Sequence, residues 1–174
     1  MATSEPVLLC LNLRRELIDE AQMARAAPAL AELAETLATF RSQGWRVLHA
    51  YTVRPRSADT PFGALPNFEP AANEPVFALQ GASALAETQV SDALAARAGQ
   101  MAGGVFSRCG LATALAAQEQ RVALAIVPDA CFAPSVDAVA AHHFLEFLDA
   151  QGAARLLGYE AWGANVICLD ARRQ

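Results

Sequence analysis

The residue whose type and position best suit chemistry is Cys109. It lies in the segment SRCG, between a strand-like and a helix-like stretch. A thiol at the start of a helix faces the positive end of the helix dipole, which lowers its pKa and increases the thiolate fraction. Nearby backbone N–H groups can stabilise an oxyanion. Cys109 is therefore a candidate nucleophile, although position alone favours a small buried residue that fills a gap in the core.

Other polar side chains follow or interrupt the strand-like segments. His49 could pair with the thiol as a base, although a histidine in an apolar strand is more typical of a hydrogen-bonded core residue. Arg14 and Arg15 follow the first apolar run and could hold a substrate carboxylate or lie at the surface. Arg54 begins a proline-rich loop and could meet an anionic ligand or stay solvated. Asp129 follows an apolar run and could cap the next segment or contact a ligand.

Composition excludes several classes of protein. The chain has 174 residues, 54% of them hydrophobic, which suits one domain over residues 1–174 with a real core. The net charge of -5 argues against a nucleic-acid partner. No apolar run reaches the length of a membrane span, and the amino-terminal run is too short for a signal peptide. We expect a cytoplasmic protein.

Two further features of the composition limit the chemistry. The four cysteines match no zinc knuckle and no CxxC pair, so free, reduced thiols are expected. All thirteen basic residues are arginines, which excludes a lysine Schiff base or a lysine base from this chain.

Strand-like and helix-like segments alternate along the chain. Strands are expected over residues 7–12, 45–53, 102–107 and 121–127, with short apolar pieces at 154–157 and 165–169. Helices are expected over residues 26–40, 83–98, 111–120 and 136–148. This alternation predicts a three-layer α/β fold with a parallel sheet of about six strands and helices on both faces. Ligands of such sheets bind beyond the carboxyl ends of the strands, here residues 12–16, 51–56, 107–109 and 128–133.

Four segments, in order, resemble the isochorismatase-like cysteine hydrolase family. The segment CGLAT at 109–113, followed by an apolar strand and DAC at 129–131, is similar to its nucleophile region. Thr113 and Asp129 fall at the family's offsets from the cysteine, four and twenty residues on. The motif of the family's first strand is similar to VLLCLNLRREL. The family's Val-Phe, Lys, Ser-Ala-Phe, Thr signature is similar to PVFALQGASALAET. The family's last helix and strand are similar to residues 142–162. The resemblance implies a Rossmann-like fold, Cys109 as nucleophile, and Thr113 and Asp129 near the substrate.

The departures from the family pattern concern the catalytic groups. Asn12 stands where the family has its aspartate base, and Leu79 stands where it has its lysine. An amide cannot accept a proton at neutral pH, and the groups of a triad act as a unit, so hydrolysis should be impaired. Glu16 could serve as a displaced base, or it is an exposed carboxylate. The Asp-x-His pair of metal-binding members is missing from YTVRPRS, so no metal or other cofactor is expected.

Three functions remain open from the sequence. The first is a divergent hydrolase that cleaves a small amide or related C–N bond through a Cys109 thioester. The second is a catalytically inactive pseudoenzyme that binds a small anion or a protein partner. The third, less favoured, is a thiol-based redox protein using Cys109 or Cys131. As the family resemblance implies, we expect a small-molecule ligand and a homo-dimer or homo-tetramer.

Overall fold

The computed structural model describes residues 5–14, 20–52, 65–95, 97–104, 109–132, 143, 146–147 and 155–156. Six strands form one sheet in the order β3-β2-β1-β4-β5-β6, and every neighbouring pair is parallel. The strands are β1 (Val7–Leu11), β2 (Arg46–Thr52), β3 (Val76–Leu79), β4 (Gly99–Gly103), β5 (Leu124–Cys131) and β6 (Arg155–Leu156). The parallel sheet and its strand number confirm the expectation from the sequence.

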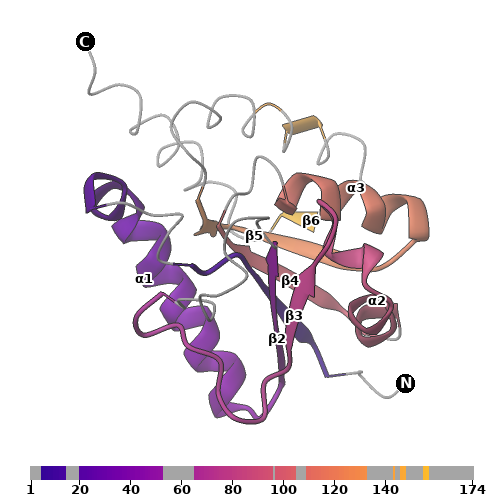
Figure 1. Ribbon diagram of the computed structural model, residues 1–174, viewed down its shortest axis with the longest axis horizontal. Coiled ribbons are helices and arrows are strands. Elements are labelled where there is room, and N and C mark those ends of the chain that lie inside the picture. Colours follow the sequence, from indigo (N-terminus) through magenta and orange to yellow (C-terminus); the bar gives the residue numbers. More distant parts are fainter. Residues whose placement is uncertain are drawn as a thin grey trace.

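Helices cover both faces of the sheet (Figure 1). Helix α1 (Glu20–Ser42) packs on one face, and helices α2 (Thr88–Ala95) and α3 (Leu111–Gln120) pack on the other, together with the short 3₁₀ helix η2 (Ala84–Ala86). Alternate residues of β1 explain the two cores, since Leu9 lies in the α2/α3 core and Leu8 lies in the α1 core. No helix in the described part of the chain is long and apolar enough to cross a membrane.

The end of α1 shows how local sequence ends a helix. Gly44 has a φ of 67°, and its N–H donates to Arg41 O, while the N–H of Trp45 donates to Phe40 O. These two bonds are a Schellman motif, in which glycine accepts the left-handed conformation without a Cβ clash. The Phe40 and Trp45 rings meet edge to face at 5.2 Å between centroids. Gly44 therefore stops the helix as its sequence position predicts.

Several predicted boundaries are wrong. The helix predicted over 83–98 is η2 followed by the shorter α2, and β4 begins at Gly99 rather than at residue 102. A Cβ at Gly99 would lie 2.7 Å from Leu94 and 2.8 Å from Leu124, so glycine permits close packing of α2 and β5 on β4. Strand β5 begins three residues later than predicted, because Arg121 caps α3 in the left-handed conformation.

Some expectations lie mostly outside the described residues. The helix predicted over 136–148 is described only at residues 143, 146 and 147. The apolar piece at 165–169 is not described at all.

Candidate functional site at the carboxyl ends of β1 and β4

The strand order places a switch point between β1 and β4. From β1 the chain proceeds outward to β2 and β3 on one side and to β4, β5 and β6 on the other. In open parallel sheets the connections diverge at such a point, which leaves a crevice beyond the carboxyl ends of the two central strands. Asn12 directly follows β1, and Cys109 follows β4 by six residues. This topology therefore predicts a ligand crevice at Asn12 and Cys109.

Asn12 is held by the neighbouring strand in a conformation that few residues accept. Its φ is 50°, in the left-handed region where asparagine, aspartate and glycine are favoured. Its Oδ1 accepts two hydrogen bonds from Thr52, one from the backbone N–H at 2.8 Å and one from Oγ1 at 2.9 Å. The residue is 1% exposed, and its Nδ2 has no hydrogen-bond partner among the described residues. An asparagine thus keeps the backbone that an aspartate would adopt here but supplies no charge.

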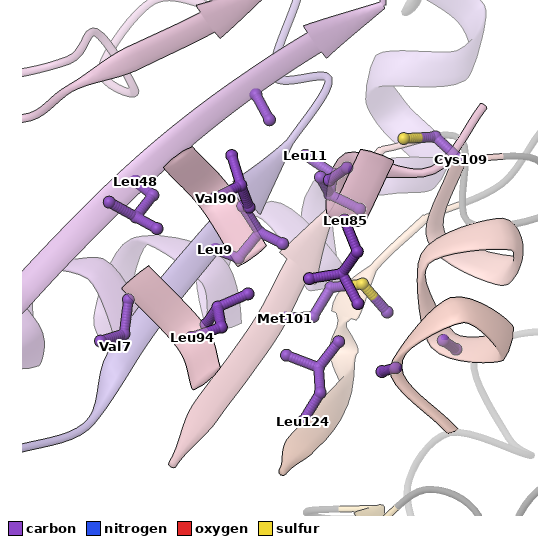
Figure 2. Close-up of a cluster of buried hydrophobic side chains, with 14 of the residues drawn as sticks. Val7, Leu9, Leu11, Leu48, Leu85, Val90, Leu94, Met101, Cys109 and Leu124 are labelled. Atoms are coloured by element: carbon purple, nitrogen blue, oxygen red, sulfur yellow. The ribbon is translucent and has the colours of Figure 1, made fainter. Parts of the chain in front are cut away.

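Cys109 lies next to Asn12 and Thr113. Burial raises the pKa of the thiol to about 11, although hydrogen-bonding contacts from Thr113 and Asn12 favour the thiolate and oppose the shift. Among the described residues no carboxylate contributes to that pKa, which agrees with an asparagine in place of an aspartate. In Figure 2 the sulfur of Cys109 points toward the end of the core that holds Leu11 and Leu85. The thiol is therefore largely protonated at neutral pH.

Thr113 connects the α3 end of the site to η2. Its Oγ1 accepts a hydrogen bond of 2.9 Å from the backbone N–H of Ala84, and the side chain is completely buried. Ser83 caps η2 through its side-chain oxygen, which accepts from the Leu85 N–H at 3.2 Å. Leu85 packs into the same core as Cys109. The segment that resembles the family's Ser-Ala-Phe signature thus supports the residue four positions after the cysteine.

Leu79 ends β3 and lies beside this arrangement. It pairs in register with Thr52, the residue that binds Asn12. Its side chain is 1% exposed and belongs to the same hydrophobic core as Cys109. A leucine here contributes apolar contact and no positive charge, so nothing at this position stabilises a thiolate.

His49 does not act with Cys109, because it lies on the opposite face of the sheet. Its neighbours Leu48 and Ala50 belong to the core that holds Cys109, so the alternation of β2 directs His49 toward α1. There its Nε2 lies 2.9 Å from Glu74 Oε2, and Arg41 of α1 donates to both oxygens of the same carboxylate. The prediction of a hydrogen-bonded core histidine is confirmed, and the alternative of a base for the thiol is wrong.

The charge states in this second cluster follow from its contacts. Burial alone would raise the pKa of Glu74, but hydrogen bonds from Arg41, the Ala71 N–H and His49 outweigh it and lower the pKa to about 2. Burial lowers the pKa of His49 despite the adjacent carboxylate. An ionised Glu74 can only accept, so the neutral ring donates from Nε2. Its Nδ1 has no hydrogen-bond partner among the described residues.

Asp129 does not end its strand. It lies inside β5, two residues before Cys131, where the pairing with β4 is irregular and three extra residues are accommodated. Burial raises the pKa of Asp129, and its Oδ1 is buried without a hydrogen bond among the described residues. The segment that follows residue 132 lies outside the described residues, so capping of that segment and contact with a ligand both stay predictions.

Three of the predicted binding residues, Arg15, Glu16 and Arg54, lie outside the described residues. Arg14 is described and is 3% exposed, and its Nη1 donates to Thr52 O at 2.8 Å. Thr52 was missed by the sequence analysis, although it is the residue that orients Asn12. Its signal was a hydroxyl residue at the carboxyl end of the strand next to β1. Among the described residues no group of three or more His, Cys, Asp or Glu side chains could hold a metal ion.

Comparisons with known proteins agree with this geometry. A sequence model of the isochorismatase domain matches residues 6–156. The chain belongs to the isochorismatase family. A search of the curated proteins found no match.

Solved structures show the same fold at low sequence identity. A putative isochorismatase hydrolase from Oleispira antarctica has a TM-score of 0.72 and 21% identity, with 90% of this chain and 95% of that chain covered. N-carbamoylsarcosine amidase from Thermoplasma acidophilum has a TM-score of 0.71 and 18% identity, with 87% and 95% covered. A pyrazinamidase/nicotinamidase from Streptococcus mutans has a TM-score of 0.68 and 13% identity, with 87% and 99% covered. At these identities the likeness shows the fold and not the activity.

Proposed function

We propose that this isochorismatase-family protein binds a small ligand in the Cys109 crevice and hydrolyses amides poorly or not at all. The observation that carries the proposal is the pair of side chains at the two other positions of the family pattern: Asn12, which contacts the thiol, and Leu79, which lies in the same core. Asn12 has a neutral amide at the position of the family's aspartate base. Leu79 has an apolar side chain at the position of the family's lysine, whose positive charge would stabilise a thiolate. Neither residue can take the thiol proton, and no described carboxylate shifts the thiol pKa.

The thiolate makes up only a very small fraction of Cys109 at neutral pH. With a pKa of about 11, the thiol ionises only to about 0.03% at pH 7.5. A cysteine hydrolase normally obtains its thiolate from a base or an adjacent positive charge. Loss of both groups therefore leaves the binding surface in place while removing most of the chemical step.

The second candidate is a slow cysteine hydrolase that forms a thioester at Cys109 and releases the acid by water attack. One observation favours it: Thr113 and Asn12 both favour the thiolate of Cys109, which lies in the helical turn that leads into α3. Glu16 is the proposed displaced base of this alternative. The thiol-redox interpretation has less support, because burial raises the pKa of Cys131 to about 12.

Steady-state hydrolysis of a panel of small amides separates the two candidates. We expect the wild-type protein and Cys109→Ala to release ammonia at the same background rate. A rate in the wild type that exceeds Cys109→Ala more than about tenfold would establish the hydrolase and overturn the proposal. The double variant Asn12→Asp, Leu79→Lys is the positive control, because it restores the acid and the amine of the family pattern. Hydrolysis gained by this variant and abolished by adding Cys109→Ala would support a decayed catalytic site.

A further inference from the structure

We propose that His49, Glu74 and Arg41 form an acid-sensitive latch. The latch holds residues 65–75, here called the strap, against α1 and β2 at neutral pH, and it releases the strap when His49 takes up a proton. His49 lies on the face of the sheet opposite Cys109, so this release does not depend on the function proposed above.

The strap has few buried contacts of its own. It contains no helix or strand and leads directly into β3. Its buried residues are Leu65, Phe68 and Glu74, and its other side chains are exposed or partly exposed. Leu65 and Phe68 pack into the α1 core, whereas Glu74 makes polar contacts. A segment with so little buried apolar surface opens at a lower free energy than the sheet beneath it, so the contacts of Glu74 matter for its attachment.

Glu74 joins the strap to two other elements through one carboxylate. Its Oε1 accepts from Nε of Arg41 on α1 at 2.7 Å. Its Oε2 accepts from Nη2 of Arg41 at 2.8 Å and from the Ala71 N–H at 2.9 Å, and Nε2 of His49 on β2 lies 2.9 Å from the same oxygen. Arg41 also donates to the carbonyl oxygen of Glu69 in the strap at 2.9 Å. Weakening of this cluster therefore loosens the strap from α1 and β2 together.

The buried ring of His49 suits this cluster only while it is neutral. The residue is 0% exposed, and its Nδ1 has no hydrogen-bond partner among the described residues. A proton on Nδ1 would create a buried N–H without an acceptor, and a second positive charge would lie on the carboxylate that Arg41 already neutralises. Burial lowers the pKa of His49, Glu74 opposes this shift, and Arg41 adds to it. Proton uptake is therefore more favourable in the open strap, where water reaches the ring.

The groups that touch the ring keep their charge in the range where a histidine titrates. Contacts with Arg41 and Ala71 help lower the pKa of Glu74 to about 2, and burial raises the pKa of Tyr51 to about 12 and also raises the pKa of Cys10. The charged and titratable groups around His49 are Arg41 from α1, Glu74 and Glu69 from the strap, Cys10 from β1, Tyr51 from β2, and Arg14 after β1, which acts on Tyr51.

Hydrogen–deuterium exchange with mass spectrometry, corrected for the intrinsic pH dependence of exchange, tests the latch in the whole chain. With an open-state pKa near 6.5, we expect the protection of peptides from the strap to fall at least about fivefold from pH 7.5 to 5.0, toward a limit of about 30-fold. At each pH the strap should be less protected than β1. Equal protection of the strap and β1 would mean that only global unfolding exposes the strap, which would overturn the inference.

His49→Gln is the matched control, because a glutamine can donate to Glu74 from its Nε2 but takes up no proton. We expect the protection of the strap in this variant to change less than about twofold between pH 7.5 and 5.0. A fall as large as that of the wild type would overturn the latch. An NMR titration of the His49 ring in the wild type tests the same point without a substitution. A pKa below 6.5 supports the latch, and a value of 6.5 or higher overturns it, because proton uptake would then not favour the open strap.

Discussion

The reactivity of Cys109 toward iodoacetamide gives a quantitative test of the site. The perturbation is pH, because only the thiolate is alkylated. With a pKa of about 11, the thiolate fraction at pH 7.5 is about 300-fold smaller than that of a free cysteine with a pKa near 8.5. A thiolate of higher pKa is intrinsically more nucleophilic, by about tenfold or slightly more for this difference. The net expectation is alkylation about 20- to 30-fold slower than that of a free thiol.

The pH profile is more informative than the rate at one pH. The side chain is 2% exposed, so limited access slows alkylation at every pH and lowers the whole profile. The position of the inflection is unaffected by access. We expect the rate constant to rise about tenfold per pH unit from pH 7 to beyond pH 10.

The assay must resolve Cys109 from the other cysteines. Peptide mapping by mass spectrometry after timed labelling reports each thiol separately, and a short synthetic peptide with the sequence CGLAT serves as the free-thiol reference. Cys10 and Cys131 are buried, and burial raises the pKa of both thiols, so they should label even more slowly. An inflection for Cys109 below pH 9 would refute the argument, because it would require a base or positive charge that the described residues do not supply.

Three further predictions concern the framework of the site. Thr113→Val should lower the unfolding free energy by about 1–3 kcal/mol, because it leaves the buried Ala84 N–H unpaired, and Thr113→Ser should recover most of the loss in urea denaturation. Glu74→Gln should flatten the pH dependence of stability in the same assay. The wild-type carboxylate has its pKa lowered from 4.5 to about 2, so it stabilises the fold above pH 4.5, and this contribution is lost as the pH falls toward 2. A wild type and variant with parallel pH profiles between pH 4.5 and 2 would contradict this. Gly103→Ala should lower the thermal midpoint, with a cost of at least about 2 kcal/mol, because φ is 120° and a Cβ would overlap the backbone of Leu11. Gly81→Ala, where a Cβ meets open space, is the matched control and should change stability by less than about 0.5 kcal/mol.

Local pattern was sufficient for the helix α3 and for the fully buried strand β1. The helix predicted at 111–120 has those bounds in the structure, and β1 lies within its predicted range. Strand β3 was not recognised as a strand, because it has four residues at the edge of the sheet and only its last side chain, Leu79, is buried. The start of β4 was predicted three residues too late, because a glycine in a sequence is typical of a helix end. In the structure Gly99 is the first residue of the strand and permits close packing.

The candidate site was only partly accessible to sequence reasoning. Similarity to a family motif placed Asn12, Leu79, Cys109 and Thr113 at one end of the sheet. It did not identify Thr52, because a threonine at the end of a strand has no distinctive pattern of its own. It also left open whether His49 faces the thiol, since the face of a strand depends on which core each neighbour enters.

The sequence alone determined which chemical groups exist in this protein: a chain without lysine, an amide at position 12 and an apolar side chain at position 79. Those facts limit proton transfer wherever the residues lie. Only the tertiary structure decided what the groups do to one another. The hydrogen bonds from Thr52 to Asn12 cross from β2 to β1 over 40 residues of chain, and Asn12 meets Cys109 almost 100 residues away. Hydrogen bonds act over about 3 Å, so their partners depend on how the strands are ordered in space and not on spacing along the chain.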